Sequence, residues 1–173
     1  MSSPNLNLTL ALVGSVAGTS PITGTSLNEA VNVQQLLQLL AGTGAGQADT
    51  ILQQTGSIAA SGTLAVDLNG AATDVFGATV NLLHVKAIIL LASSANTNDV
   101  QISPGASNAF TGPFSGTTPA VAVSPGEMFL ITKGSGSQVG WPVVAATGDI
   151  LKLANSGAGT AVGYTLIVIG TST

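Results

Sequence analysis

The chain has 173 residues, of which 45% are hydrophobic and only 6% are charged, and its formal net charge is −4. It contains three Lys, no Arg and no Cys, which excludes an electrostatic nucleic-acid surface, disulfides and cysteine-based metal or catalytic sites. The longest uninterrupted apolar run, residues 87–92, is far shorter than the ~20 residues that a membrane-spanning helix needs. We therefore expect no nucleic-acid partner and no membrane partner.

The N-terminal segment begins with a strand pattern. Leu6, Leu8, Leu10 and Leu12 alternate with polar or small residues, and this period of two predicts a half-buried strand. A Pro and several Gly, Ser and Thr residues over positions 21–26 predict a flexible connector after it.

The next segment, residues 27–41, is compatible with two structures. Ser26 and Glu29 have the spacing of a capping box, which favours a helix that ends before Gly42. Alternate apolar residues favour a strand equally well, so both structures stay open on the sequence alone. The residues that fit the strand are Val31, Val33, Leu37 and Leu39.

Short strand patterns separated by turn residues recur through the rest of the chain. The expected strands are residues 66–68, 80–93, 100–102, 121–123, 128–132, 142–145, 150–153 and 162–169. The run 80–93 is apolar on both faces at its far end, which is typical of a central strand covered on both sides. This series predicts an all-β fold, a single antiparallel β-sandwich or jelly-roll-like domain with an N-terminal arm.

Turn residues predict how some of these strands connect. Ser103-Pro104-Gly105 and Ser124-Pro125-Gly126 both fit type II turns, because Pro sets a negative φ and Gly accepts a positive one. Residues 149–155 and 160–170, joined by a Gly-rich loop, predict a C-terminal hairpin.

No motif has the spacing of a catalytic or metal site. The Gly-rich residues 42–46 lack the basic and acidic partners of a nucleotide site and predict a turn. His84 is the only His and has no Gly-x-Ser-x-Gly context, so we expect a surface or interface side chain. The carboxylates occur singly and are interpreted as solvated turn residues, which predicts a non-enzyme without a cofactor or metal. They are Glu29, Asp49, Asp67, Asp74, Asp99, Glu127 and Asp149.

Several apolar side chains are candidates for contact with a partner. Phe110 and Phe114 lie in a predicted loop, where they either pack that loop on the sandwich or anchor a partner, and the same alternatives hold for Trp141. Phe129 and Tyr164 lie in predicted strands and are expected in the core. The candidate interface residues are Leu6, Leu8, Leu10, Leu12, Phe110, Phe114 and Trp141.

The surface composition favours association between copies. Ala, Gly, Ser and Thr account for 83 of the 173 residues, so most of the exterior must be small and neutral. A surface with so little charge repels other copies weakly and favours contacts based on burial and backbone hydrogen bonds. We therefore expect an obligate assembly, as in a structural subunit.

A series of short phrases in the later part of the chain carries a resemblance. The phrases are Gln47-Ala-Asp49, Ser57-Ile-Ala-Ala-Ser-Gly62, Val66-Asp-Leu68, Phe76-Gly-Ala-Thr79, His84-Val-Lys-Ala87, Asn96-Thr-Asn98, residues 110–114, Asp149-Ile-Leu151 and Ala154-Asn-Ser-Gly-Ala-Gly159. In wording and order they resemble small virion structural proteins of tailed bacteriophages, of the capsid decoration (cement) type. The resemblance covers residues 47–173, interpreted as the β-sandwich domain, and weakens over residues 1–46, interpreted as the arm.

The resemblance implies a function and a place. A protein of this type would sit on the outer capsid surface of the virion as a homo-oligomer, most commonly a homotrimer, after synthesis in the host cytoplasm. Its partner would be the phage major capsid protein, and it would stabilise the head without any cofactor. The alternative is a tail or fibre subunit with a carbohydrate-binding β-sandwich, in which Trp141, Phe110 or Phe114 would stack on sugar rings.

Overall fold

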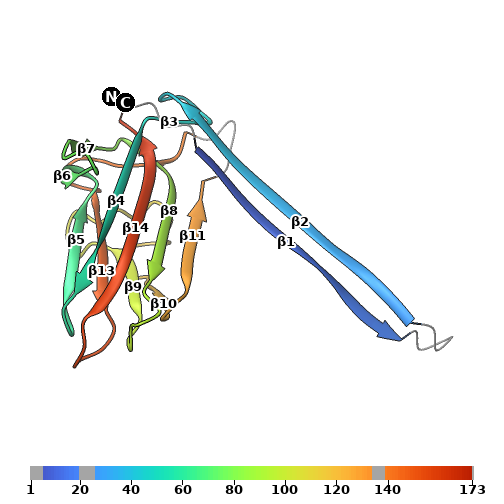
Figure 1. The fold of residues 1–173 in the computed structure, drawn as a ribbon. Helices are drawn as coiled ribbons and strands as arrows, with labels where there is room; N and C mark the ends of the chain where they lie inside the picture. Colours follow the sequence, from blue (N-terminus) through green and yellow to red (C-terminus); the bar gives the residue numbers. More distant parts are fainter. Residues whose placement is uncertain (1–5, 20–25, 134–138, 173) are drawn as a thin grey trace.

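The computed structural model describes residues 6–19, 26–133 and 139–172, and every regular element in these ranges is a β-strand (Figure 1). Two long strands form an arm that projects from a body of shorter strands (Figure 1). The strands are β1 (Leu6–Thr19), β2 (Ser26–Ala41), β3 (Gln47–Ala48), β4 (Thr50–Ile58), β5 (Thr63–Asp67), β6 (Asn69–Thr73), β7 (Thr79–Asn81), β8 (His84–Ala92), β9 (Val100–Pro104), β10 (Val121–Val123), β11 (Met128–Thr132), β12 (Trp141–Pro142), β13 (Ile150–Asn155) and β14 (Val162–Thr171).

The body is a sandwich of two antiparallel sheets. The front sheet has the order β11-β8-β14-β4, with β12 paired to β8, and the back sheet has the order β10-β9-β13-β5. A single cluster of buried apolar side chains from both sheets fills the space between them. The predicted all-β, antiparallel sandwich with an N-terminal arm is therefore confirmed.

Alternation of side chains builds this core. On β13, Leu151 and Leu153 point inward and are fully buried, while the residues between them are only half-buried. On β14, Leu166 and Val168 do the same from the opposite sheet. Each such side chain contributes roughly 1.5–3 kcal/mol by leaving water, so the inward rows of the two sheets hold the sandwich together.

The expected C-terminal hairpin is wrong. β13 belongs to the back sheet and β14 to the front sheet, so the Gly-rich loop between them crosses from one sheet to the other. β13 pairs with β9 and β5, and β14 pairs with β4 and β8, which leaves neither strand an edge for the other. Pairing with strands distant in sequence buries one face of each strand in the core, which a local hairpin would not do.

Residues 27–41 form a strand, so the helix is the wrong alternative. β2 pairs with β1 along its whole length, with Leu37 opposite Leu8 and Leu39 opposite Leu6. Leu37 and Leu39 are buried against the body. The strand gives β1 a hydrogen-bonding partner and places both leucines on one face, whereas a helix would leave β1 unpaired.

The two predicted Pro-Gly turns have different outcomes. Gly126 has φ +82°, and the amide of Glu127 donates to the carbonyl of Ser124 at 2.9 Å, which confirms the type II turn there. The turn at residues 103–105 is wrong, because Pro104 ends β9 and lies opposite Leu151 of β13.

A β-bulge in β8 changes which side chains face the core. Ala87 lies opposite Ile169 but Val85 lies opposite Gly170, so Lys86 is the extra residue between them. The uninterrupted alternation expected over residues 80–93 therefore breaks at Lys86. Val85 therefore faces the core, whereas the Lys86 side chain is not part of the core cluster.

Candidate functional site

The arm, formed by β1 and β2, has one face that is more apolar than the other, although the other face also exposes Val13, Leu36 and Leu40. β1 has 14 residues, which at about 3.3 Å per residue gives a ribbon roughly 46 Å long. Residues directly opposite in an antiparallel pair share a face, so Leu12 and Val33 lie on the same side as Leu37 and Leu39. We call these four residues the apolar face of the arm. The side chains of the candidate interface residues Leu6, Leu8 and Leu10 lie outside the described part of the structure.

This apolar face is covered at one end and open at the other. Leu37 and Leu39 are only 5% and 1% exposed, because they pack against Ala87 and Ile169 of the front sheet. Leu12 is 62% exposed and Val33 is 60% exposed. An isolated two-stranded ribbon is marginally stable in water, so an exposed apolar row of this length requires a covering surface.

Lys86 holds the base of the arm. Its ammonium donates a hydrogen bond of 3.3 Å to the carbonyl oxygen of Gly44, in the turn that follows β2. The side chain is fully buried, and burial lowers the pKa of its ammonium. The turn itself is closed by Gln47, whose Oε1 accepts from the Gly44 amide at 2.8 Å. The Gly-rich residues 42–46 are therefore a turn, as predicted. The bond from Lys86 to Gly44 connects this turn, at the base of the arm, to the bulge of β8.

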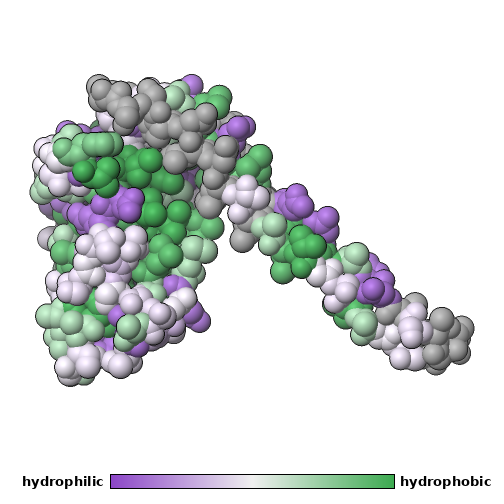
Figure 2. Space-filling model, viewed as in Figure 1, coloured by the Kyte–Doolittle hydropathy of each residue, from purple (hydrophilic) through white to green (hydrophobic). Residues whose placement is uncertain are grey.

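The outward side of the front sheet continues the surface that the arm base covers. Leu91 pairs with Met128 and Thr165, and Ile89 pairs with Leu130 and Ile167, in two neighbouring rows across the sheet. Figure 2 shows green, hydrophobic surface gathered over these strands. We define the outer face as the apolar residues on the outward side of the sheet that the arm base leaves partly or fully exposed, of which Ile51 and Ile167 still pack against the arm-base cluster. They are Ile51, Ile89, Leu91, Met128, Leu130 and Ile167.

The outer face is accessible to solvent. Met128 is 56% exposed and Leu91 is 38% exposed, and the remaining four residues are half-buried. Beyond the arm base, the outward positions of β4, β14, β8 and β11 carry Ile, Leu, Met, Thr, Ser, Gly and Gln but no charged side chain. Such a surface binds an uncharged apolar partner more readily than a charged one.

The predicted interface aromatics belong to the core instead. Phe110 is 1% exposed and Trp141 is 8% exposed, and Phe114 packs against the same core cluster. Lys133 also covers the Trp141 ring, with Nζ 5.6 Å from the ring centroid. We therefore correct the expectation that Phe110 and Trp141 anchor a partner, because the loop closes over the sandwich and removes them from the surface. The expectation that Phe129 and Tyr164 contribute to the core is confirmed.

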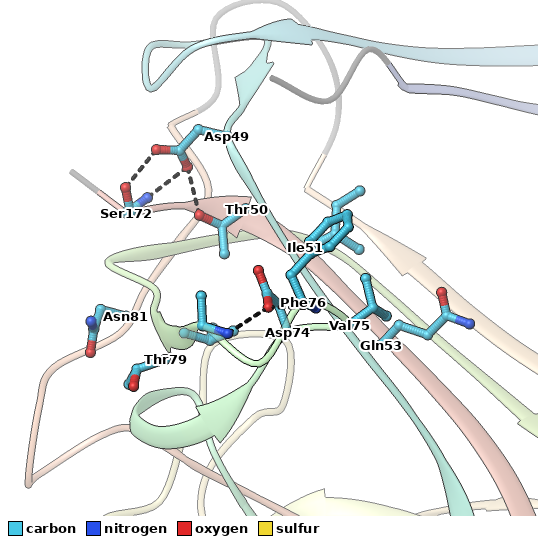
Figure 3. Close-up of a pocket in the computed structure, with 12 residues that line it drawn as sticks. Asp49, Thr50, Ile51, Gln53, Asp74, Val75, Phe76, Thr79, Asn81 and Ser172 are labelled. Carbon is cyan, nitrogen blue, oxygen red and sulfur yellow. Dashed lines mark hydrogen bonds between the residues drawn. The ribbon is translucent and has the colours of Figure 1, made fainter. Parts of the chain in front are cut away.

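A groove of about 810 Å³ lies between β4 and the turn from β6 to β7 (Figure 3). Phe76 lines it and is 79% exposed. The two carboxylates that line the groove accept hydrogen bonds from nearby groups of the chain. Asp74 Oδ1 accepts from the amides of Phe76 and Ala78 at 2.9 Å each. Asp49 accepts from the Ser172 amide at 2.9 Å and from the Ser172 hydroxyl at 2.5 Å. These bonds stabilise a turn and a strand end, and they explain both carboxylates structurally.

The remaining polar candidates are also structural. Asp67 Oδ1 accepts from the Asn69 amide at 2.9 Å, as expected of a turn carboxylate. Asp149 departs from that expectation: it is 3% exposed, and its Oδ2 accepts from the Ala146 amide at 2.5 Å, because the 144–149 loop folds over it. His84 is half-buried, and its Nδ1 has no hydrogen-bond partner among the described residues, so no catalytic triad forms through that atom.

Sequence reasoning missed the outer face. It placed Ile89 and Leu91 in a central strand covered on both sides, but the arm base covers only the end of that strand near Ala87. The available signal was the apolar run of β8 together with β11, since two neighbouring strands that are apolar on both faces require two covering layers. Only the pairing of β8 with β11 reveals that these rows lie side by side.

Within the described ranges, no three His, Cys, Asp or Glu side chains come together where a metal ion would bind. None of the described residues belongs to a helix with the length and hydropathy that crossing a membrane requires. Compared with known protein-family models and with curated proteins, the sequence has no match.

Proposed function

We propose that the chain is a virion structural protein of a tailed bacteriophage, a decoration (cement) protein that binds the outer capsid surface and stabilises the head. The observation that carries this proposal is the arm, whose exposed Leu12 and Val33 continue the row that Leu37 and Leu39 bury at its base. A projecting ribbon with an uncovered apolar face is suited to bridging neighbouring subunits of a lattice. The resemblance of residues 47–173 to decoration proteins supports the same function.

The chemistry of the body agrees with a structural role. The two carboxylates of the groove accept hydrogen bonds from backbone amides of a turn and a strand end. Phe110 and Trp141, which a sugar-binding fibre subunit would use for stacking on sugar rings, are buried. The head is therefore favoured over a carbohydrate-binding tail or fibre. The resemblance implies a homotrimer on the major capsid protein, and the low number of charges favours association through apolar contacts. We therefore also propose that the protein assembles as a homotrimer and contacts the major capsid protein through burial of apolar side chains.

The test uses heads of the phage that carries this protein, prepared with and without it. We expect heads without the protein to release DNA at a lower temperature, and added wild-type protein to bind the heads and restore the higher temperature. A Leu12→Glu variant should bind weakly, while the matched Val13→Glu variant, on the other face of the arm, should bind like the wild type. Equal release temperatures with and without the protein, or density for it only at the tail in cryo-electron micrographs, would contradict the proposal.

The trimer has its own measurement. Light scattering of the purified full chain at tens of micromolar should give three times the mass of one chain. A stable monomer at that concentration would contradict the trimer in solution, whatever the result with heads.

A further inference from the structure

The outer face of the front sheet is only partly covered by the described residues of its own chain. Its rows lie directly beside residues that the arm base already covers: Ala87 pairs with Ile169, and both are buried under Leu37 and Leu39. The next row, which contains Ile89 and Ile167, is only half-buried. Leu91 and Met128, one row further, are exposed. The chain's own arm base therefore covers the outward side of the sheet no further than the row of Ile89 and Ile167.

The direction of the arm explains why its own chain covers no more. The Lys86 bond to Gly44 and the backbone bond of 3.1 Å from Leu40 to Gly46 hold the arm at the end of the sheet. From there β1 and β2 lead away from the body (Figure 1), and Leu12 and Val33 on these strands are exposed to solvent. The two uncovered apolar surfaces of the chain do not meet within one molecule.

We propose that the outer face binds the exposed part of the apolar face of the arm, around Leu12 and Val33, from a second copy of this chain. This contact would extend an interface that each chain already makes, in which arm leucines pack against outward residues of β8 and β14. The two surfaces are similar in chemistry, since both present aliphatic side chains and neither the six outer-face residues nor Leu12 and Val33 carry a charge. Glu29, opposite Val16, is on the same face of the arm but nearer its tip. Each copy would give one arm and receive one.

The second copy is the occupant that these observations favour. A capsid protein on the outer face would leave the exposed arm in need of another cover, whereas exchange of arms buries both surfaces with one kind of contact. When each copy gives one arm and receives one, the copies form a closed ring if the rotation between them closes, and the proposed homotrimer is such a ring. In this arrangement the exposed arm residues contact other copies, so the weak head binding expected of Leu12→Glu follows from loss of assembly and not from loss of a direct contact between the arm and the capsid.

Crosslinking between copies tests the contact directly. The chain contains no Cys, so single introduced cysteines report one position each. A tagged copy with Leu12→Cys and an untagged copy with Leu91→Cys are produced together and treated with a bismaleimide. We expect a crosslinked pair of chains, several times more abundant than with Val13→Cys, which lies next to Leu12 on the opposite face of the arm and is 69% exposed.

Two crosslinking outcomes would overturn the proposal. One is equal yield from Leu12→Cys and Val13→Cys, or no yield from either. The other is a link within one chain when Leu12→Cys and Leu91→Cys are combined in the same copy, without links between copies, because that result would place the chain's own arm on the outer face.

Association strength provides a second, independent measurement. Leu12→Glu and Leu91→Glu should each raise the dissociation constant of the full-length assembly by more than about tenfold, since each puts a charge where a leucine is buried. The matched substitutions Val13→Glu, on the other face of the arm, and Val144→Glu, an exposed residue at 55%, should change it by less than about threefold. Circular dichroism confirms that each variant is folded. A folded Leu91→Glu variant with wild-type association would overturn the proposal, and capsid binding is measured separately.

Discussion

The ammonium of Lys86 donates a hydrogen bond of 3.3 Å to the carbonyl oxygen of Gly44, across 42 residues of sequence. This bond connects the bulge of β8 to the turn at the base of the arm. Lys86 is fully buried, and burial lowers the pKa of its ammonium below the ordinary 10.5. The position of the arm on the body thus depends on a buried cation.

The first prediction concerns pH. Because the pKa of Lys86 is lowered only in the folded state, the unfolded chain binds more protons between the folded pKa and 10.5. The free energy of unfolding contributed by Lys86 therefore rises as the pH rises through that window. Urea unfolding at about pH 7 and about pH 10 should show the wild type gaining stability relative to Lys86→Met. A difference between the two proteins that is the same at both pH values would contradict this prediction.

The second prediction concerns the arm. Deletion of residues 1–25 removes β1 but keeps Leu37 and Leu39 at the arm base. None of the described core residues between the two sheets comes from β1, so the midpoint of thermal unfolding should change by less than about 4 °C. Light scattering and head binding should both show loss of association. If the truncated chain unfolds or aggregates outright, β1 is required by the fold and the prediction is wrong.

The third prediction compares two phenylalanines. Phe110→Ala removes a side chain that is 1% exposed and should lower the free energy of unfolding by about 3–5 kcal/mol. Phe76→Ala changes a side chain that is 79% exposed and should alter it by less than about 0.5 kcal/mol. Urea titrations followed by circular dichroism measure both. A similar cost for the two substitutions would show that Phe110 is not a core residue.

The fourth prediction concerns the loop that crosses between the sheets. Asn155 is 6% exposed, and its Nδ2 donates to the carbonyls of Thr160 at 2.8 Å and Ala59 at 3.1 Å. Asn155→Ala leaves these part-buried carbonyls without their donor and should cost about 1–3 kcal/mol in urea unfolding. The exposed Asn81 provides the control, and Asn81→Ala should be close to neutral. Equal effects would mean that Asn155 does not hold the crossing.

The fifth prediction concerns the single imidazole. His84→Ala should leave assembly and head binding unchanged, because His84 Nδ1 makes no hydrogen bond with the described residues. Sedimentation with heads and light scattering measure the two properties. A hydrolytic activity that disappears in this variant, with an unchanged circular dichroism spectrum, would overturn the interpretation as a non-enzyme.

The sequence by itself determined the class of fold and the character of the surface. Leu151 and Leu153 occupy every second position of their segment, and so do Leu166 and Val168. This spacing predicts strands, because a period of two places alternate side chains on one face. The turn at Gly126 was equally readable, since its residue types meet a local backbone requirement. Local physics decides both features, so no knowledge of distant residues is needed.

Only the tertiary structure decided which surfaces meet. Whether residues 27–41 form a helix or a strand depends on β1, which offers a partner of equal length. The separation of β13 from β14, the burial of Trp141 and the bulge that aims Lys86 at Gly44 all depend on residues far away in the chain. Burial and pairing are properties of contacts between distant segments, and periodicity shows that a face is apolar without showing what covers it. The arm and the outer face are therefore visible as two uncovered surfaces only in three dimensions.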